Sequence, residues 1–181
     1  MKYSNHITLL LLVSIAILCL ISFKANAEAF CPPGIPTTAN DEEFELKPNG
    51  EVLHLASNLV FMRCSIGQTW DGAECLGDAN TFTWKEALNT SIATEFAGQT
   101  SWRLPNIKEL SVILERACVR PAINETIFPN TPSSDYWTNT PNIYNQGTAW
   151  SIAFSNASNS YTPIDRSMHI RLVRPNINVT E

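Results

Sequence analysis

Residues 101–110, Ser-Trp-Arg-Leu-Pro-Asn-Ile-Lys-Glu-Leu, constrain the fold of this chain more than any other stretch. The pattern up to Leu104 is typical of an extended segment, and Pro105 prevents a helix from running through it. Asn106 then begins a helical pattern with Glu109 three residues later, which predicts a capping box. In such a box the Asn106 side chain accepts from the Glu109 N–H, while the Glu109 carboxylate accepts from the Asn106 N–H. The stretch therefore predicts a strand-to-helix joint.

The N-terminus has the pattern of an export signal. Lys2 precedes an uncharged apolar run at residues 9–23, and Ala25-Asn26-Ala27 is typical of a signal-peptidase site. The run is short for a membrane span, which needs about 20 apolar residues. We therefore expect a cleaved signal over residues 1–27 and a periplasmic, cell-surface or secreted protein without a membrane span after cleavage.

The charge of the mature chain excludes some partners. Cleavage would leave 154 residues with 10 basic and 17 acidic side chains, a formal charge of −7. This length suits one domain with its own core. An acidic chain without a basic run is not suited to bind nucleic acid or an anionic membrane. The sequence leaves the oligomeric state open.

The four cysteines that follow the signal predict two disulfides, because their number is even and the expected compartment is oxidising. Three connectivities are possible. Cys64 and Cys75 flank a turn-rich segment, which favours a local bridge, and Cys31 would then pair with Cys118. Zinc is disfavoured, since the spacings lack a Cys-x-x-Cys pattern and the two histidines of the mature chain stand apart.

The rest of the chain predicts short strands, then two helices, then strands, which is the order of an α+β fold. Extended segments are expected at residues 44–46, 52–55, 58–63, 135–140, 150–155 and 169–174.

Thr83 and Glu86 form a second predicted capping box. The helix that follows is expected to run to Gly98, with an apolar face formed by Trp84, Leu88, Ile92 and Phe96. The helix after Asn106 is expected at residues 107–116, with an apolar stripe formed by Ile107, Leu110, Ile113, Leu114 and Ala117.

Short motifs follow one another in a specific order and spacing over most of residues 58–175. They are residues 62–72 (MRCSIGQTWDG), 83–88 (TWKEAL), 101–110, 118–124 (CVRPAIN), 128–132 (FPNTP), 136–140 (YWTNT), 149–150 and 171–175 (RLVRP). Together they resemble the Lcl C-terminal domain family of bacteria.

The resemblance implies a C-type-lectin-like fold, related to that of formylglycine-generating enzymes, with short antiparallel strands, two main helices and disulfides. It also implies a secreted or surface module used in adhesion or carbohydrate binding. The expected organisation is a signal peptide at 1–27, an N-terminal tail with the first strands at 28–57, the domain at 58–175 and a C-terminal tail at 176–181.

A mixture of aromatic and polar residues at 135–142 is typical of a binding loop, so we expect Trp137, Tyr136 and Asn139 to contact a ligand. Arg103 is a further candidate, because a guanidinium binds carboxylates and phosphates well, with an internal ion pair as the alternative. Glu109 is better explained as a cap, together with Asn106, than as a catalytic acid or base.

The sequence shows no nucleophile elbow, phosphate loop, metalloprotease helix or dinucleotide fingerprint. Calcium would need a dense loop of acidic ligands, whereas the aspartates are scattered, so no cofactor is expected. We therefore expect a non-catalytic module that binds a glycan or an envelope or surface protein. The alternatives are a small enzyme on a formylglycine-generating-enzyme-like fold and a structural envelope or appendage subunit.

Overall fold

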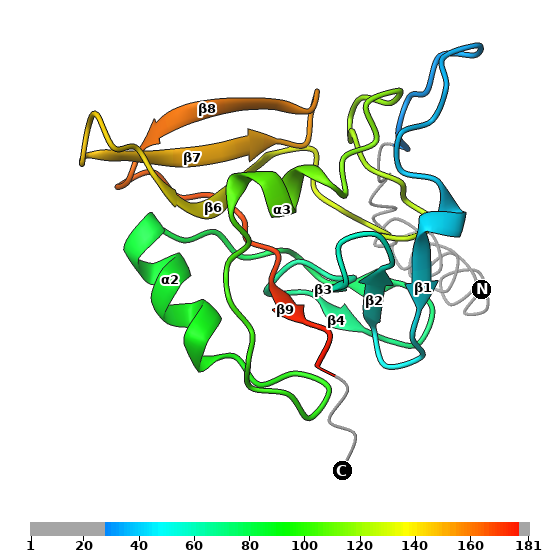
Figure 1. The fold of residues 1–181 in the computed structure, drawn as a ribbon, viewed down its shortest axis with the longest axis horizontal. Helices are drawn as coiled ribbons and strands as arrows, with labels where there is room; N and C mark the ends of the chain where they lie inside the picture. Colours follow the sequence, from blue (N-terminus) through cyan, green and yellow to red (C-terminus); the bar gives the residue numbers. More distant parts are fainter. Residues whose placement is uncertain (1–27, 178–181) are drawn as a thin grey trace, which may run out of the picture.

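The computed structural model describes residues 28–177. The expected signal at residues 1–27 and the last residues of the C-terminal tail lie outside this part of the chain. Strands, two helices and further strands follow one another, and the sheets are antiparallel (Figure 1). The predicted α+β class is therefore confirmed. A short 3-10 helix, η1 (Asp41–Glu43), precedes the first strand.

A four-stranded sheet joins the two ends of the described chain (Figure 1). Its order is β1 (Phe44–Leu46), β2 (Glu51–His54), β3 (Leu59–Met62) and β9 (Val173–Pro175). Gly50 ends the turn between β1 and β2 with φ of +84°, and a Cβ there would lie 2.7 Å from the Trp70 ring. Glycine is required at this position for both reasons.

A three-stranded sheet forms the second layer (Figure 1). Its order is β6 (Asp135–Pro141), β7 (Thr148–Ala153) and β8 (Ser158–Pro163). The strands β4 (Thr69–Trp70) and β5 (Cys75–Leu76) form a separate short ribbon.

Both capping boxes form as predicted, but both helices are shorter than expected. The first helix, α2 (Trp84–Ala93), ends before Phe96, which makes a bridge with Gln99 instead. Its buried face is formed by Ala87 and Ser91, and Ile92 is 72% exposed. The predicted apolar face is therefore wrong at Ile92, because tertiary packing selected a neighbouring face of small residues.

The second helix, α3 (Ile107–Ser111), ends five residues before the expected Arg116. The chain leaves the helix because Leu114 forms a bridge with Ile123, and the Glu115 N–H donates to the Ala122 carbonyl at 3.1 Å. These bonds replace the helical ones. The expected apolar stripe is nevertheless buried at Leu110, Ile113, Leu114 and Ala117.

Two hydrophobic cores lie on opposite faces of the β6–β7–β8 sheet. Tyr136 and Ile152 pair across strands and pack in one core with Leu110 of α3. Trp137 of β6 and Ala149 of β7 face the other way, into a core that also contains Ala87 of α2. Side chains alternate between the faces of a strand, so β6 is buried from both sides.

Two disulfides form, in the pairing that the sequence favoured. Cys31 pairs with Cys118 and attaches the N-terminal segment to the body of the domain. Cys64 pairs with Cys75 and closes the loop that carries β4.

Candidate functional site

Tyr136 and Trp137, two of the expected ligand contacts, lie in the core with exposures of 0%. The Tyr136 hydroxyl is 2.6 Å from Ser65 Oγ, and Trp137 Nε1 donates to the Phe82 carbonyl at 2.8 Å. The strand is also covered at its edge, where the Trp137 N–H donates to the His169 carbonyl. The structure thus corrects the expectation for both rings, because neither presents an atom to a ligand at the surface.

Arg103, the third expected contact, forms an ion pair within the joint. Its two terminal nitrogens donate to the two carboxylate oxygens of Glu109, each at 2.8 Å. The hydrogen bond from Arg103 lowers the pKa of Glu109, and the same bond raises the pKa of Arg103. The structure therefore favours the ion-pair alternative for Arg103.

The cap itself is complete at this joint. Asn106 Oδ1 accepts from the N–H groups of Lys108 and Glu109 at 2.9 Å, and Glu109 Oε2 accepts from the Asn106 N–H at 2.8 Å. Asn139, the fourth expected contact, is half-buried beside it and donates its N–H to the Pro105 carbonyl at 2.9 Å. The four expected contacts therefore divide between the core and the joint and form no common surface.

The loop between β6 and β7, residues 142–147, carries the two most exposed large hydrophobic side chains of the described chain. Ile143 is 80% exposed and Tyr144 is 87% exposed. The sequence pattern predicted a binding loop at residues 135–142 and did not single out these two residues. The signal that could have found them is a pair of large apolar residues between Asn142 and the turn residues Asn145-Gln146-Gly147.

This loop is held by its own asparagine side chains. Asn142, which is 7% exposed, accepts from the Tyr144 N–H at 2.9 Å and donates to Thr148 Oγ1 at 3.0 Å. Asn145 Oδ1 accepts from the Gly147 N–H at 3.0 Å. The Thr148 N–H donates to the Asn145 carbonyl at 3.1 Å. The backbone is therefore preorganised, while Ile143 and Tyr144 remain in solvent.

A pair of aromatic rings lies on β7, which follows this loop, and on the neighbouring strand β8. Trp150 of β7 pairs with Tyr161 of β8 across the sheet, with ring centroids 4.0 Å apart. Trp150 is half-buried and Tyr161 is 45% exposed. Trp150 begins the extended segment that the sequence predicted at residues 150–155, and its ring reaches the surface beside Tyr161.

An acidic cleft of about 620 Å³ lies along the Cys31–Cys118 disulfide, but its carboxylates hold the N-terminal segment. Glu115 is 2% exposed and accepts from the N–H groups of Thr38, Ala39 and Ala117 at 2.8–3.1 Å. Burial raises the pKa of Glu115, but these hydrogen bonds outweigh burial and the net pKa is lowered. Such a carboxylate is a poor general base.

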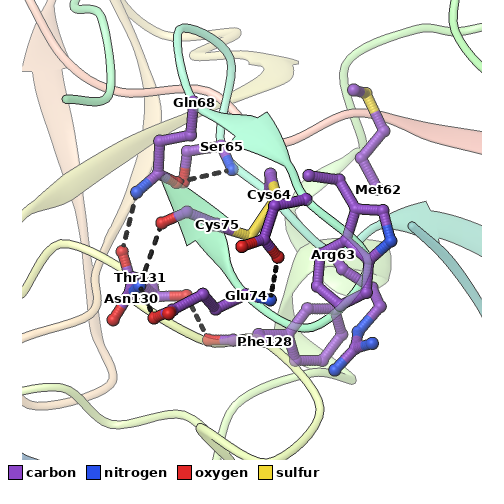
Figure 2. The surroundings of a disulfide bond; sticks show 12 residues. Met62, Arg63, Cys64, Ser65, Gln68, Glu74, Cys75, Phe128, Asn130 and Thr131 are labelled. Carbon is purple, nitrogen blue, oxygen red and sulfur yellow. Dashed lines mark hydrogen bonds between the residues drawn. A yellow bond between two sulfur atoms is a disulfide. The ribbon is translucent and has the colours of Figure 1, made fainter. Parts of the chain in front are cut away.

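A second polar cluster surrounds the Cys64–Cys75 disulfide (Figure 2). Gln68 Nε2 donates to the Asn130 carbonyl at 2.9 Å, and Asn130 Nδ2 donates to the Cys75 carbonyl at 2.9 Å. These bonds connect the disulfide loop to the segment before β6. They are structural, because they satisfy backbone groups on both sides.

Arg171 lies next to this cluster and is completely buried. It donates to the carbonyls of Met62 (2.9 Å) and Arg63 and to Thr131 Oγ1 (2.7 Å). Its guanidinium also lies 4.9 Å from the centre of the Phe128 ring. Burial lowers the pKa of Arg171 to about 10, so the side chain is still charged at neutral pH. It binds the end of β3 to the C-terminal part of the chain.

No group of three or more histidine, cysteine, aspartate or glutamate residues within 28–177 is arranged to hold a metal ion. Nδ1 of His54 lies 2.7 Å from Ser57 Oγ, and Nδ1 of His169 lies 2.9 Å from the Asn80 carbonyl oxygen. Across the same described residues, every helix is too short or too polar to cross a bilayer.

A family model described as the Lcl C-terminal domain matches residues 50–174. The matched range contains both helices, the joint, the Cys64–Cys75 disulfide and the loop at residues 142–147. A search of curated proteins found no significant match.

Proposed function

The chain belongs to the Lcl C-terminal domain family, and from this membership we propose that it is an exported, non-catalytic binding module. The observation that carries the proposal is the preorganised loop at residues 142–147, which presents Ile143 and Tyr144 to solvent. A rigid loop binds with a smaller loss of conformational entropy than a flexible one. Adjacent large apolar side chains that a fold keeps exposed are a feature of surfaces that bind a partner.

The proposed ligand is a glycan or a protein of the cell envelope or cell surface. Tyrosine provides a flat, amphipathic surface that suits either class. Ile143 extends this surface with an aliphatic side chain, which favours an apolar pocket on a protein partner. The acidic balance of the chain disfavours a polyanionic ligand such as a sulfated glycan or a nucleic acid.

We also propose that the α+β architecture is a variant of the C-type-lectin-like fold and that the protein is located outside the cytoplasm. The first proposal is supported by a sheet that joins the two ends of the described chain and by a strand-rich second half. The second is supported by the two disulfides, which form and persist in oxidising compartments, and by the signal pattern at residues 1–27.

The test is a glycan array combined with a pull-down from the native cell envelope, using the wild type and the variants Tyr144→Ser and Ile143→Ser. Each substitution is expected to weaken binding by about tenfold or more, because central aromatic and aliphatic contacts carry most of the binding energy. Ile35→Ser is the matched control, since Ile35 is 52% exposed and lies on a different segment.

Two results would contradict the proposal. One is that neither method detects a specific ligand for the wild type. The other is that a ligand is found and both loop variants bind it as well as the Ile35→Ser control does. The second result would support a binding module but would show that the loop at residues 142–147 is not its binding site.

A further inference from the structure

The outer edge of β8 differs from every other sheet edge in the described chain. β8 pairs with β7 alone, over six consecutive residue pairs without a register shift. Within residues 28–177, no backbone hydrogen bond outside the sheets joins residues 159–162 to another segment. Alternate N–H and C=O groups along this strand therefore face solvent.

The other edges are short or covered. β1 has three residues and includes the charged Glu45. The outer side of β9 is occupied, because Val173 exchanges two backbone hydrogen bonds of 3.0 Å with Arg103. β6 is covered by the segment at His169, which bonds both Asp135 and Trp137. Only β8 thus offers a full-length open ladder among the strands of residues 28–177.

β8 also lacks the features that protect natural edge strands. Its sequence is Ser-Asn-Ser-Tyr-Thr-Pro, with no charged residue, and its only proline is the last residue, Pro163. Lysines, internal prolines and bulges are the usual means by which proteins prevent edge pairing. An edge of this length without any of them is a template for another strand.

We propose that β8 pairs in the antiparallel direction with β8 of a second copy of this chain, which extends the sheet to β6–β7–β8–β8–β7–β6. Charge favours a second copy as the occupant. The chain is acidic overall, so most self-contacts bring like charges together, whereas the β8 seam contains none. A two-fold axis through the seam gives a closed, self-complementary interface.

Both faces of the seam are suited to this arrangement. Trp150 and Tyr161 lie on one face, and the two-fold axis brings the pairs of both copies onto the same face of the joined sheet. The other face carries a hydroxyl cluster, in which Ser151 Oγ is 2.8 Å from Thr162 Oγ1 and 3.3 Å from Ser160 Oγ. Aromatic pairs and Ser/Thr pairs are both favourable across antiparallel strands.

The inference is tested with Ser160→Lys and Ser160→Glu, because Ser160 is exposed and lies at the centre of β8. Analytical ultracentrifugation of the protein purified after expression of the full chain should show a dimer for the wild type. Each variant alone should raise the dimer dissociation constant by about tenfold or more, since like charges meet across the axis. An equimolar mixture of the two variants should restore the dimer, because opposite charges then face each other.

The matched controls are Asn89→Lys and Asn89→Glu, at an exposed position on α2, and both should remain dimeric. Circular dichroism verifies that each variant is folded. A wild type that stays monomeric at high concentration would refute the pairing. So would a Ser160→Lys protein that dimerises as well as the controls, or a mixture that does not reassociate. The proposed ligand site is unaffected by these results, because Ile143 and Tyr144 lie outside the strand.

Discussion

The joint at residues 101–110 and the loop at residues 142–147 are both stabilised by asparagine side chains that bond the backbone, but the two segments have different roles. In each, an asparagine side-chain oxygen accepts from nearby backbone N–H groups, at 2.9 Å for Asn106 and 2.9 Å for Asn142. In the joint, however, the large apolar side chain Leu110 is completely buried, whereas Tyr144 in the loop is 87% exposed.

The difference separates two kinds of ordered segment. Hydrogen bonds to the backbone show that a segment has one conformation, but they do not show what the conformation is for. The direction of the large side chains shows the role of the segment. The joint orders the chain so that side chains enter the core, and the loop orders it so that they leave the core.

The largest effect is expected for Leu110→Ala in the joint. Leu110 packs against the core that contains Tyr136 and Ile152, so its truncation should lower the free energy of unfolding by about 2–5 kcal/mol. Urea denaturation of the variant and the wild type measures this difference. A loss below about 1 kcal/mol would mean that α3 does not depend on this core.

Asn106→Ala should cost about 1 kcal/mol, because it removes the acceptor for two N–H groups at the start of α3. Thermal unfolding followed by circular dichroism measures the change. Asn106→Asp is the conservative control and should retain the cap. If Asn106→Ala is as stable as the wild type yet does not bind the ligand, the joint is part of the binding site and the comparison fails.

Glu109→Gln should cost less than about 1 kcal/mol at neutral pH, because the lost ion pair with Arg103 is partly exposed and screened by solvent. The wild-type pKa of Glu109 is lowered on folding, so its contribution is present above the pKa of the unfolded carboxyl. The contribution disappears as the pH falls below about 4.

Stability measured from neutral to acid pH should therefore converge for the Glu109→Gln variant and the wild type. A gap that stays constant down to the lowest pH would show that the charge of Glu109 is not what stabilises the joint.

Tyr144→Ser in the loop should change the free energy of unfolding by no more than about 0.5 kcal/mol, because the exposed ring makes little contact with the fold. Chemical denaturation and ligand binding should be measured on the same preparation. The comparison predicts an unchanged midpoint together with weaker binding. A large loss of stability would place Tyr144 among the structural residues, as Leu110 is.

Local features of this fold could be predicted from the sequence. Both capping boxes depend on residues three positions apart, and the short disulfide depends on a turn between its cysteines. The end of α3 could not be predicted, because the helix is ended by a bridge between Leu114 and Ile123. These residues are nine positions apart, and no local sequence pattern indicates that they pair.

The same limit explains the error at Tyr136 and Trp137. Their polar neighbours suggested a surface loop, but β6 has α3 on one face and α2 on the other. Which helices cover a strand depends on tertiary packing, and the local sequence of the strand does not show it. Conversely, the exposure of Ile143 and Tyr144 follows from turn residues on both sides, so a closer examination of local turn chemistry could have found them.

The position of Arg171 in the chain has a consequence for the order of folding. Its guanidinium satisfies carbonyls at the end of β3, and β9, which follows it directly, pairs with the open side of β3. A ribosome delivers the N-terminal residues first, so β3 and its first neighbour, β2, are synthesised long before its second neighbour, β9. One side of β3 therefore remains unpaired in the nascent protein until the residues of β9 have been synthesised.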